Sequence, residues 1–405
     1  MYFTINPSNR VDDVVDYLSA NEAATRLGVS RQTLYAYVSR GLLRAHDTED
    51  PRQRRYSSDA VARLADQRRR GRRPKEVAKA TLDWGLPVME SAITLIQGGQ
   101  LSYRGTDAVA LAETASVEDV AASLWRLPAA AAFGAVAPAM PEIMTALTRH
   151  YKGAPRDEAL LPLFATATSD DGSALWQHDP RRLAEGCGAL VRIMLSCVAD
   201  APPSAAPLHR QLAKAWRLDG KSADLLRMAL VLCADHELNA SSFTARCVAS
   251  TGASLRAAVI GGLAALSGGR HGGMTARIET FWAGLDNGTV LPQMRRRLAA
   301  GEALPGFDHP LYPDGDPRAT LLLAHLLPHF PRARQLVTAA VQLTGHAPNI
   351  DFSLVVLRRF LKLPEGAAFG VFALGRSVGW IAHALEQRET GQLIRPRAIY
   401  TGPIP

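Results

Sequence analysis

From residue 78 onward, the hydrophobic positions of the chain recur at the spacing of an α-helix. Ala, Leu, Val and Arg dominate this stretch, and runs that alternate apolar and polar residues are scarce. A period of 3.6 residues predicts helices, whereas strict alternation would predict strands. Segments rich in Gly, Pro, Ser and Asp separate the apolar runs, at 98–100, 169–172, 201–207, 267–273, 304–317 and 346–349. The pattern therefore predicts a mostly helical region with short loops.

A shorter helical pattern lies between residues 18 and 44. Gly28 interrupts it, and Ser30 is placed to cap a second helix. The apolar positions expected to face inward are Ala23, Ala24, Leu27, Leu34 and Val38. Two short helices joined by a glycine turn are typical of a helix-turn-helix, in which the second helix enters the major groove of DNA.

Polar and basic residues around this hairpin predict contacts with duplex DNA. The second helix would present polar side chains to base edges, and a small wing after it would present arginines to phosphates. A third helix, capped near Ser57 or Ser58, would follow the wing. The side chains predicted to contact DNA are Arg31, Gln32 and Thr33 on the second helix and Arg54 and Arg55 on the wing. The order resembles the winged helix-turn-helix of the mercury-resistance regulator and excisionase type.

The same module has a second interpretation. Ten basic residues lie between positions 52 and 75, and a block of like charge is equally typical of a solvated face or a linker. Tyr35 and Tyr37 would either contact DNA or pack against the wing. Pro74 is suited to begin the next helix, so the module is expected to span residues 1–76.

Composition narrows the class of protein. The chain has 405 residues, 47% hydrophobic and 21% charged, with a net charge of +8 concentrated near the N-terminus. We expect a cytoplasmic protein with no membrane partner, because no signal sequence is recognisable and no apolar stretch reaches about 18 to 20 residues. The four cysteines lack CxxC spacing, which favours reduced structural thiols and no bound metal.

Four motifs in the second half of the chain carry chemistry. They are DHELNAS at 235–241, GGRHGG at 268–273, GFDHPLYPDGDPRA at 306–319 and APNIDF at 347–352. Their order and setting resemble the citrate synthase family over residues 84–405. A further stretch, QGGQLSYRG at 97–105, resembles the opening of that family, and its Tyr103, Arg104 and Gly105 are expected to be structural.

The resemblance implies roles for individual residues. Asp351 would be the base that removes a proton from the acyl thioester, His271 would donate to the thioester oxygen, and His309 would polarise the ketone. The expected keto-acid ligands are His236, Arg318, Arg376 and Arg395, and the expected CoA contacts are Gly306 and Phe307. Arg395 would come from the other subunit, which implies a homodimer with a shared active site. No cofactor is expected, because acyl-CoA and oxaloacetate are substrates.

Four positions depart from the family pattern. Cys233 replaces a histidine found in many members, Asp308 replaces a glycine, and Pro310 and Pro313 lie where basic residues are usual. These changes bear on CoA affinity and keto-acid preference. Two roles also have structural alternatives, with Asp351 as a loop cap and Arg376 as a surface ion-pair partner.

The predicted protein is all-α, with a small winged helix-turn-helix before a synthase-like domain at 77–405. A large subdomain would comprise 80–271 and 361–405, and a small one 272–360. The favoured function is condensation of an acyl-CoA, acetyl-CoA foremost, with oxaloacetate, as in the tricarboxylic acid cycle. Two alternatives stay open: a transcriptional regulator that uses the fold as a dimeric metabolite sensor, and a 2-methylcitrate synthase that uses propionyl-CoA.

Overall fold

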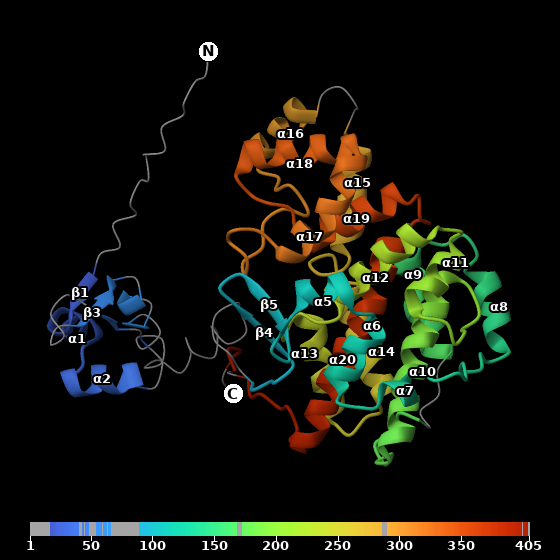
Figure 1. The fold of residues 1–405 in the computed structure, drawn as a ribbon, viewed down its shortest axis with the longest axis horizontal. Helices are drawn as coiled ribbons and strands as arrows, with labels where there is room; N and C mark the ends of the chain where they lie inside the picture. Colours follow the sequence, from blue (N-terminus) through green and yellow to red (C-terminus); the bar gives the residue numbers. More distant parts are fainter. Residues whose placement is uncertain are drawn as a thin grey trace. The chain divides into compact units, whose positions relative to one another are not determined.

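The chain forms two compact units, Met1–Glu90 and Ser91–Pro405, in the computed structural model (Figure 1). The structure describes residues 17–39, 43, 45–47, 54–58, 60–62, 64–65, 89–167, 172–285, 290–398 and 400–403. The expected domain boundary at residue 76 and most of the basic block lie outside these ranges. That boundary and the subdomain limits at 272 and 360 stay predictions.

The N-terminal unit combines two helices with a three-stranded antiparallel sheet. Its elements are β1 (Tyr17–Ser19), α1 (Ala20–Leu27), α2 (Arg31–Ser39), β2 (His46–Asp47) and β3 (Arg54–Ser57). The strand order is β1-β3-β2, so β2 and β3 form the expected wing and β1 extends it. The described residues after the wing, at 58, 60–62 and 64–65, are helical.

Local interactions explain the two helices. Ser19 and Glu22 form a reciprocal capping box at the start of α1. Gly28 ends α1 in the left-handed region at φ 63°, which a residue without Cβ adopts readily. The Ser30 hydroxyl then accepts the backbone N–H of Thr33 at 3.2 Å and opens α2. The predicted helix-turn-helix is confirmed.

The predicted inward positions of this unit form its core. Leu34 is fully buried, Tyr37 packs partly buried against the core, and Tyr35 is 44% exposed. The two tyrosines therefore differ: packing holds Tyr37, whereas Tyr35 faces solvent. The buried core residues are Ala23, Ala24, Leu27, Leu34, Leu43, Tyr56, Val61 and Leu64.

The second unit opens with a small sheet and is otherwise helical. Its strands, β4 (Thr94–Gln97), β5 (Gln100–Tyr103) and β6 (Thr106–Asp107), form an antiparallel meander. Gly98 and Gly99, at φ 59° and 75°, make the two-residue turn between β4 and β5. The fold-class prediction, helical with only small sheets, is confirmed.

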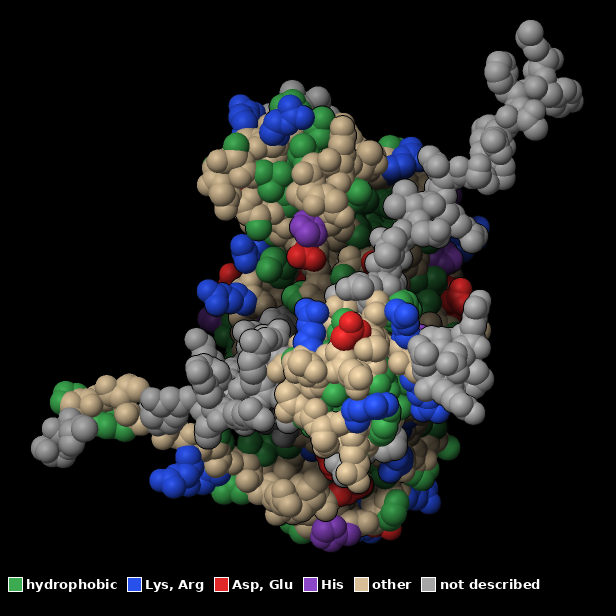
Figure 2. Space-filling view, turned by 90° about the vertical axis from the view of Figure 1, so that its left-hand side faces the viewer, with side chains coloured by type: hydrophobic (Ala, Val, Ile, Leu, Met, Phe, Trp, Pro, Cys, Tyr) green, Lys and Arg blue, Asp and Glu red, His purple; other side chains and the backbone are tan. Residues whose placement is uncertain are grey.

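The helices of the second unit surround one long central helix. In chain order they are α5 (Ala108–Thr114), α6 (Val117–Trp125), α7 (Ala129–Ala132), α8 (Ile143–His150), α9 (Arg156–Ala167), α10 (Pro180–Ala199), α11 (Leu208–Ala215), α12 (Gly220–Cys233), α13 (Ala240–Ser250), α14 (Leu255–Leu266), α15 (Met274–Ala283), α16 (Val290–Ala299), α17 (Pro317–Leu326), η1 (Leu327–His329), α18 (Pro331–Thr344), α19 (Ile350–Phe360) and α20 (Ala367–Thr390). Helix α20 packs against α6, α9, α10, α12, α13, α14 and α19. Helices α15 to α19 gather in the upper lobe of this unit in Figure 1. Figure 2 shows basic side chains at the top of this face of the molecule. The exposed residues of α16 include Arg295 and Arg296.

Helix α20 differs from one expectation. Among the residues that the structure describes, it is the one helix long and apolar enough to cross a membrane by length and composition. From the sequence we expected no apolar stretch of about 18 to 20 residues. Because 94% of its apolar window is buried within the fold, α20 serves here as a core helix.

Candidate active site

The segment between α12 and α13 holds His236, the first of the residues predicted to bind the keto acid. Asn239 caps α13, accepting the backbone N–H of Ser241 at 3.1 Å. His236 is 7% exposed, and its Nε2 lies 2.9 Å from the hydroxyl of Tyr312. Burial, followed by the charge of Arg318, holds the pKa of His236 well below its usual range. His236 is therefore a neutral hydrogen-bonding group.

The GGRHGG motif forms the turn between α14 and α15, and His271 projects from it. A Cβ on Gly272 would lie 2.6 Å from the side chain of Leu266, and one on Gly273 would lie 2.6 Å from the carbonyl of Ser267. The close approach that these two glycines allow is to the protein's own chain. These glycines shape the turn that presents His271.

Ser241 and Asn239 contact the ring of His271, and Trp380 in turn contacts Ser241. Its Nε2 lies 2.8 Å from Oγ of Ser241 and 3.2 Å from Oδ1 of Asn239. The indole N–H of Trp380 donates to the same Ser241 oxygen at 3.0 Å. Burial, with the nearby Arg376, lowers the pKa of His271 to about 4. The ring is neutral at physiological pH.

His309 lies in the loop before α17, next to His236. Their ring centres are 5.2 Å apart, and the centre of the Tyr312 ring is 4.9 Å from that of His309. Nδ1 of His309 accepts the backbone N–H of Leu311 at 3.2 Å, so the neutral ring carries its proton on Nε2. Burial, then the charge of Arg318, lowers the pKa of His309 to about 4. His309 is thus a neutral N–H donor.

Asp351 is a partly buried residue in the first turn of α19. Asn349 caps this helix by accepting the N–H of Asp351 at 3.1 Å, so Asp351 is not itself the cap. Its Oδ1 is buried and finds no hydrogen-bond partner among the described residues. Burial raises the pKa of Asp351 to about 7; Arg318 opposes the rise and Asp316 adds to it. A carboxylate with this pKa is a much stronger base than an exposed one.

Two buried arginines supply positive charge. Arg318 is 2% exposed and donates two hydrogen bonds to the carboxylate of Asp316, at 2.9 and 2.8 Å. Arg376 is 1% exposed, which excludes a surface ion pair, and its Nε donates to the carbonyl of Cys233 at 2.9 Å. Nη2 of Arg376 is buried without a hydrogen-bond partner among the described residues. Asp316 pairs with Arg318, whereas the N–H groups on Nη2 of Arg376 have no acceptor among the described residues. Arg376 is therefore the arginine with a hydrogen-bond donor still to be satisfied.

These side chains converge, although they come from five separate segments of the chain. The pKa of His236 responds to Arg318, Arg376, His309 and His271, in that order after burial. The pKa of Asp351 responds to both arginines as well. The predicted residues that the fold brings together are His236, His271, His309, Arg318, Asp351 and Arg376.

The loop predicted to contact CoA is tied to the segment that carries Asp351. The N–H of Asn349 donates to the carbonyl of Gly306 at 2.9 Å, and Phe307 forms an isolated β-bridge with Pro348. Gly306 has φ 85°, so a side chain there would be strained. Phe307 is 9% exposed, its ring packed 4.8 Å from that of Phe352. A CoA contact at Phe307 would therefore fall to its backbone.

Asp308, which departs from the family pattern, has a local structural role. Its carboxylate accepts the N–H of His309 at 2.8 Å and lies 3.6 Å from Nδ1 of His346. Its backbone is left-handed, with φ 70°, a conformation that glycine adopts more readily. Asp308 therefore helps to hold the loop that carries His309.

The remaining predicted residues are Arg395 and those of the N-terminal unit. Arg395 is exposed in the tail after α20, and within the described part of the chain it makes no hydrogen bond or ion pair. In the N-terminal unit, Arg31, Gln32, Arg54 and Arg55 are exposed. Arg31 donates to the hydroxyl of Tyr35 at 3.0 Å, and the hydroxyl of Thr33 lies 3.0 Å from that of Ser30.

Sequence reasoning missed four residues that support the site. Tyr312 bonds to His236, Asp316 orients Arg318, and Ser241 with Trp380 holds His271. Tyr312, Asp316 and Ser241 lie within the quoted motifs, so their position was a usable signal. Trp380 lies four residues after Arg376 on α20, and one helical turn would have placed it on the same face.

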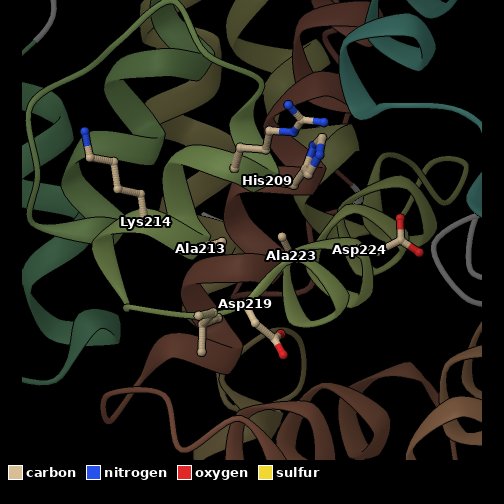
Figure 3. A pocket seen from close by; sticks show the side chains of 9 residues that line it. His209, Ala213, Lys214, Asp219, Ala223 and Asp224 are labelled. Atoms are coloured by element: carbon tan, nitrogen blue, oxygen red, sulfur yellow. The ribbon is translucent and has the colours of Figure 1, made fainter.

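A separate hollow of about 420 Å³ lies between α11 and α12 (Figure 3). Its lining includes His209, Lys214, Asp219 and Asp224, and none of the motif residues. The labelled charged side chains in Figure 3 point in different directions. The hollow is therefore distinct from the clustered site.

The fold and the cluster define a class of protein: a helical scaffold that holds a carboxyl group of raised pKa beside neutral histidines and arginines. The chain belongs to the citrate synthase family, whose C-terminal domain matches residues 81–397. A helix-turn-helix domain matches residues 17–69.

Individual relatives agree with this assignment. The citrate synthase of Haloferax volcanii is 32% identical over 366 residues, which cover 78% of this chain and 94% of that protein. A 2-methylcitrate synthase of Shewanella oneidensis is 28% identical over 347 residues, covering 76% and 91%. Citrate synthase 2 of Bacillus subtilis is 36% identical over 188 residues, covering 43% and 50%. The chain spans about half the length of several curated relatives, those at 38% identity included.

Solved structures agree in fold. Citrate synthase from Thermotoga maritima superposes with a TM-score of 0.68 at 25% identity, covering 79% of this chain and 95% of that one. The Thermoplasma acidophilum enzyme, solved as a ternary complex with carboxymethyl coenzyme A and oxaloacetate, gives 0.69 at 24% identity over the same shares. The second likeness carries the fold alone.

Proposed function

We propose that this protein is a citrate synthase-type acyltransferase that condenses an acyl-CoA, acetyl-CoA foremost, with oxaloacetate and then hydrolyses the thioester. The observation that carries the proposal is the carboxyl group of Asp351, whose Oδ1 is buried without a hydrogen-bond partner among the described residues and whose pKa is raised to about 7. A carbon acid needs a strong base, and it also needs donors for the enolate oxygen as charge develops. Neutral His271 and His309 are suited to be those donors. No cofactor is required, because acyl-CoA is a substrate.

The steps follow from the side chains. Asp351 takes a proton from the carbon next to the thioester carbonyl. His271, whose Nε2 lies against Ser241 and Asn239, supplies a ring N–H to the enolate oxygen. The enolate carbon attacks the ketone carbon, and Nε2–H of His309 supplies a proton to the alkoxide. Water then adds to the thioester, the C–S bond breaks, and CoA leaves as the thiol.

The keto acid would lie against His236, Arg318 and Arg376. The unpaired Nη2 of Arg376 supports this placement, because a buried guanidinium donor without an acceptor is costly until a ligand supplies one. Arg395 of a second subunit would complete the site, which makes the protein a homodimer. Its exposure, and its lack of hydrogen-bond and ion-pair partners among the described residues, support that role.

Thiol release from a panel of acyl-CoA thioesters with oxaloacetate tests the proposal. Release from acetyl-CoA that depends on oxaloacetate is expected. Faster release from propionyl-CoA would establish the 2-methylcitrate alternative, which the Shewanella relative supports. Absence of release with every thioester would overturn the enzymatic proposal in favour of a metabolite sensor.

The pH dependence of catalysis should follow Asp351. Because the base must be ionised, kcat/KM is expected to fall about tenfold per pH unit below the pKa of Asp351, which is about 7. His271 and His309 stay neutral until the pH approaches their pKa of about 4. Thiol-release rates between pH 5 and 9 measure the profile. An acid limb that begins only near pH 4 would contradict the assignment.

The N-terminal unit supports a second function, binding of duplex DNA. The exposed Arg31 and Gln32 at the start of α2 and the exposed Arg54 and Arg55 on the wing carry this proposal. A synthase dimer would supply the two-fold axis that paired half-sites require. Enzyme and regulator are therefore compatible readings of one chain.

Removal of residues 1–76 is expected to abolish DNA binding and leave condensation largely unchanged. In the full chain, Arg31→Ala should relax sequence preference. Arg54→Ala should instead weaken all sequences alike and flatten the salt slope by about one unit. Fluorescence anisotropy with labelled duplexes measures both effects. If the full chain binds no duplex at about 50 mM salt, where phosphate contacts are strong, the module serves protein contacts instead.

A further inference from the structure

The end of α12 lies beside β5 and α20, and tertiary contacts satisfy its last carbonyls. The hydroxyl of Tyr103 lies 3.0 Å from the carbonyl of Val231 and 3.2 Å from that of Asp235. The backbone N–H of Gly379, within α20, donates to the carbonyl of Ala234 at 2.9 Å. The helix therefore ends in a fixed position at Cys233, three residues before His236.

A buried carboxylate forms the centre of this junction. Asp235 is fully buried, and its Oδ2 accepts the hydroxyl of Thr94 at 2.6 Å and the backbone N–H of Glu237 at 3.1 Å. Nε2 of the fully buried His383 lies 3.2 Å from Oδ1 of Asp235. The carboxylate thus joins β4, the 235–239 segment that carries His236, and α20.

Close packing makes this contact specific to α20. A Cβ on Gly379 would lie 2.3 Å from Oδ1 of Asp235, so only glycine lets the carboxylate lie against the helix. His383 follows one turn later, on the same face as Gly379. Glu237, which bonds to the same carboxylate, has a left-handed backbone with φ 55°. Left-handed backbone at a non-glycine residue persists where surrounding contacts enforce it.

We propose that His383 is a positioning residue: through the Asp235 carboxylate it fixes the 235–239 segment and thereby the orientation of His236 toward the keto acid. The keto acid enters only through the proposed function; the positioning itself rests on the contacts of Asp235. Among the described residues, His383 makes no contact with His236, His271 or His309. Its effect on His236 therefore passes through the 235–239 segment.

Two variants of the full-length protein test the proposal, with a matched control. His383→Gln removes the imidazole, and Thr94→Val removes one hydroxyl from the opposite side of Asp235. Ser377→Ala is the control, because Ser377 is buried on the same helix and, within the described part of the chain, its hydroxyl bonds only to the carbonyl of Leu374. Amide hydrogen exchange of residues 234–240 is compared with that of α10, and steady-state kinetics give KM for oxaloacetate and for the acyl-CoA.

We expect exchange in residues 234–240 to rise about tenfold in both variants, while α10 keeps its protection. KM for oxaloacetate should rise about tenfold with a smaller change in kcat and in the acyl-CoA KM, and Ser377→Ala should match the parent. Unchanged exchange in 234–240, or loss of protection throughout the unit even in Thr94→Val, would overturn the proposal. An inactive parent would defeat the proposed function alone, because the exchange measurement needs no turnover.

Discussion

Replacement of Asp351 by asparagine is expected to lower turnover about a thousandfold, while oxaloacetate binding stays near that of the parent. The substitution keeps the shape of the side chain and removes the base. Calorimetric titration with oxaloacetate and thiol-release kinetics measure the two quantities. Comparable turnover in variant and parent would exclude Asp351 as the base.

Thermal unfolding of the same variant supplies an independent control. The pKa of Asp351 is raised in the folded protein, so its neutral form stabilises the fold fully below the unfolded pKa of about 3.9. This contribution is lost as the pH rises through about 7. Asparagine cannot ionise, so the variant should be more stable than the parent at pH 8, by on the order of 1–3 kcal/mol, and similar at pH 4. Lower stability at pH 8 would contradict the buried-base assignment.

Replacement of Arg395 by alanine is expected to inactivate the enzyme through the partner subunit. Neither Arg395→Ala nor Asp351→Asn is active alone, but one of the two sites in a mixed dimer would carry both parental residues. Random mixing should therefore restore about a quarter of parental activity. Thiol release after co-refolding or co-expression of the two variants measures the rescue.

The control for this experiment is a mixture of Asp351→Asn with His271→Ala. Both residues would belong to the same subunit's share of the site, so a mixed dimer has no complete site and no rescue is expected. Heterodimer formation is verified with two affinity tags. Absence of rescue by Arg395→Ala within verified heterodimers would show that Arg395 acts within its own chain or not at all.

Motifs with local signatures could be predicted from the sequence. The helix-turn-helix follows from apolar spacing with Gly28 and Ser30 at the break, because caps and turns are local. The convergence of His236, His309 and Asp351 followed from resemblance to a family. Periodicity alone could not have brought together segments more than a hundred residues apart.

Features that depend on tertiary distances could not be predicted. The raised pKa of Asp351 arises from burial. Likewise, the Phe307 side chain turns into the core against Phe352. From the sequence, Asp308 is only a replacement for a glycine of the family pattern, whereas in the structure its carboxylate accepts the backbone N–H of His309. Each of these properties needs the positions of neighbouring elements.

Helix α20 presents Arg376, Trp380 and His383 to three different parts of the site at intervals of about one turn. Arg376 donates to the carbonyl of Cys233 at the end of α12, and Trp380 donates to Ser241, which contacts His271. His383 contacts the carboxylate of Asp235. Substitutions at these positions should therefore be epistatic, since a small rotation of one rigid helix shifts all three contacts together. A library that varies α20 one position at a time would underestimate what paired changes can do to substrate choice.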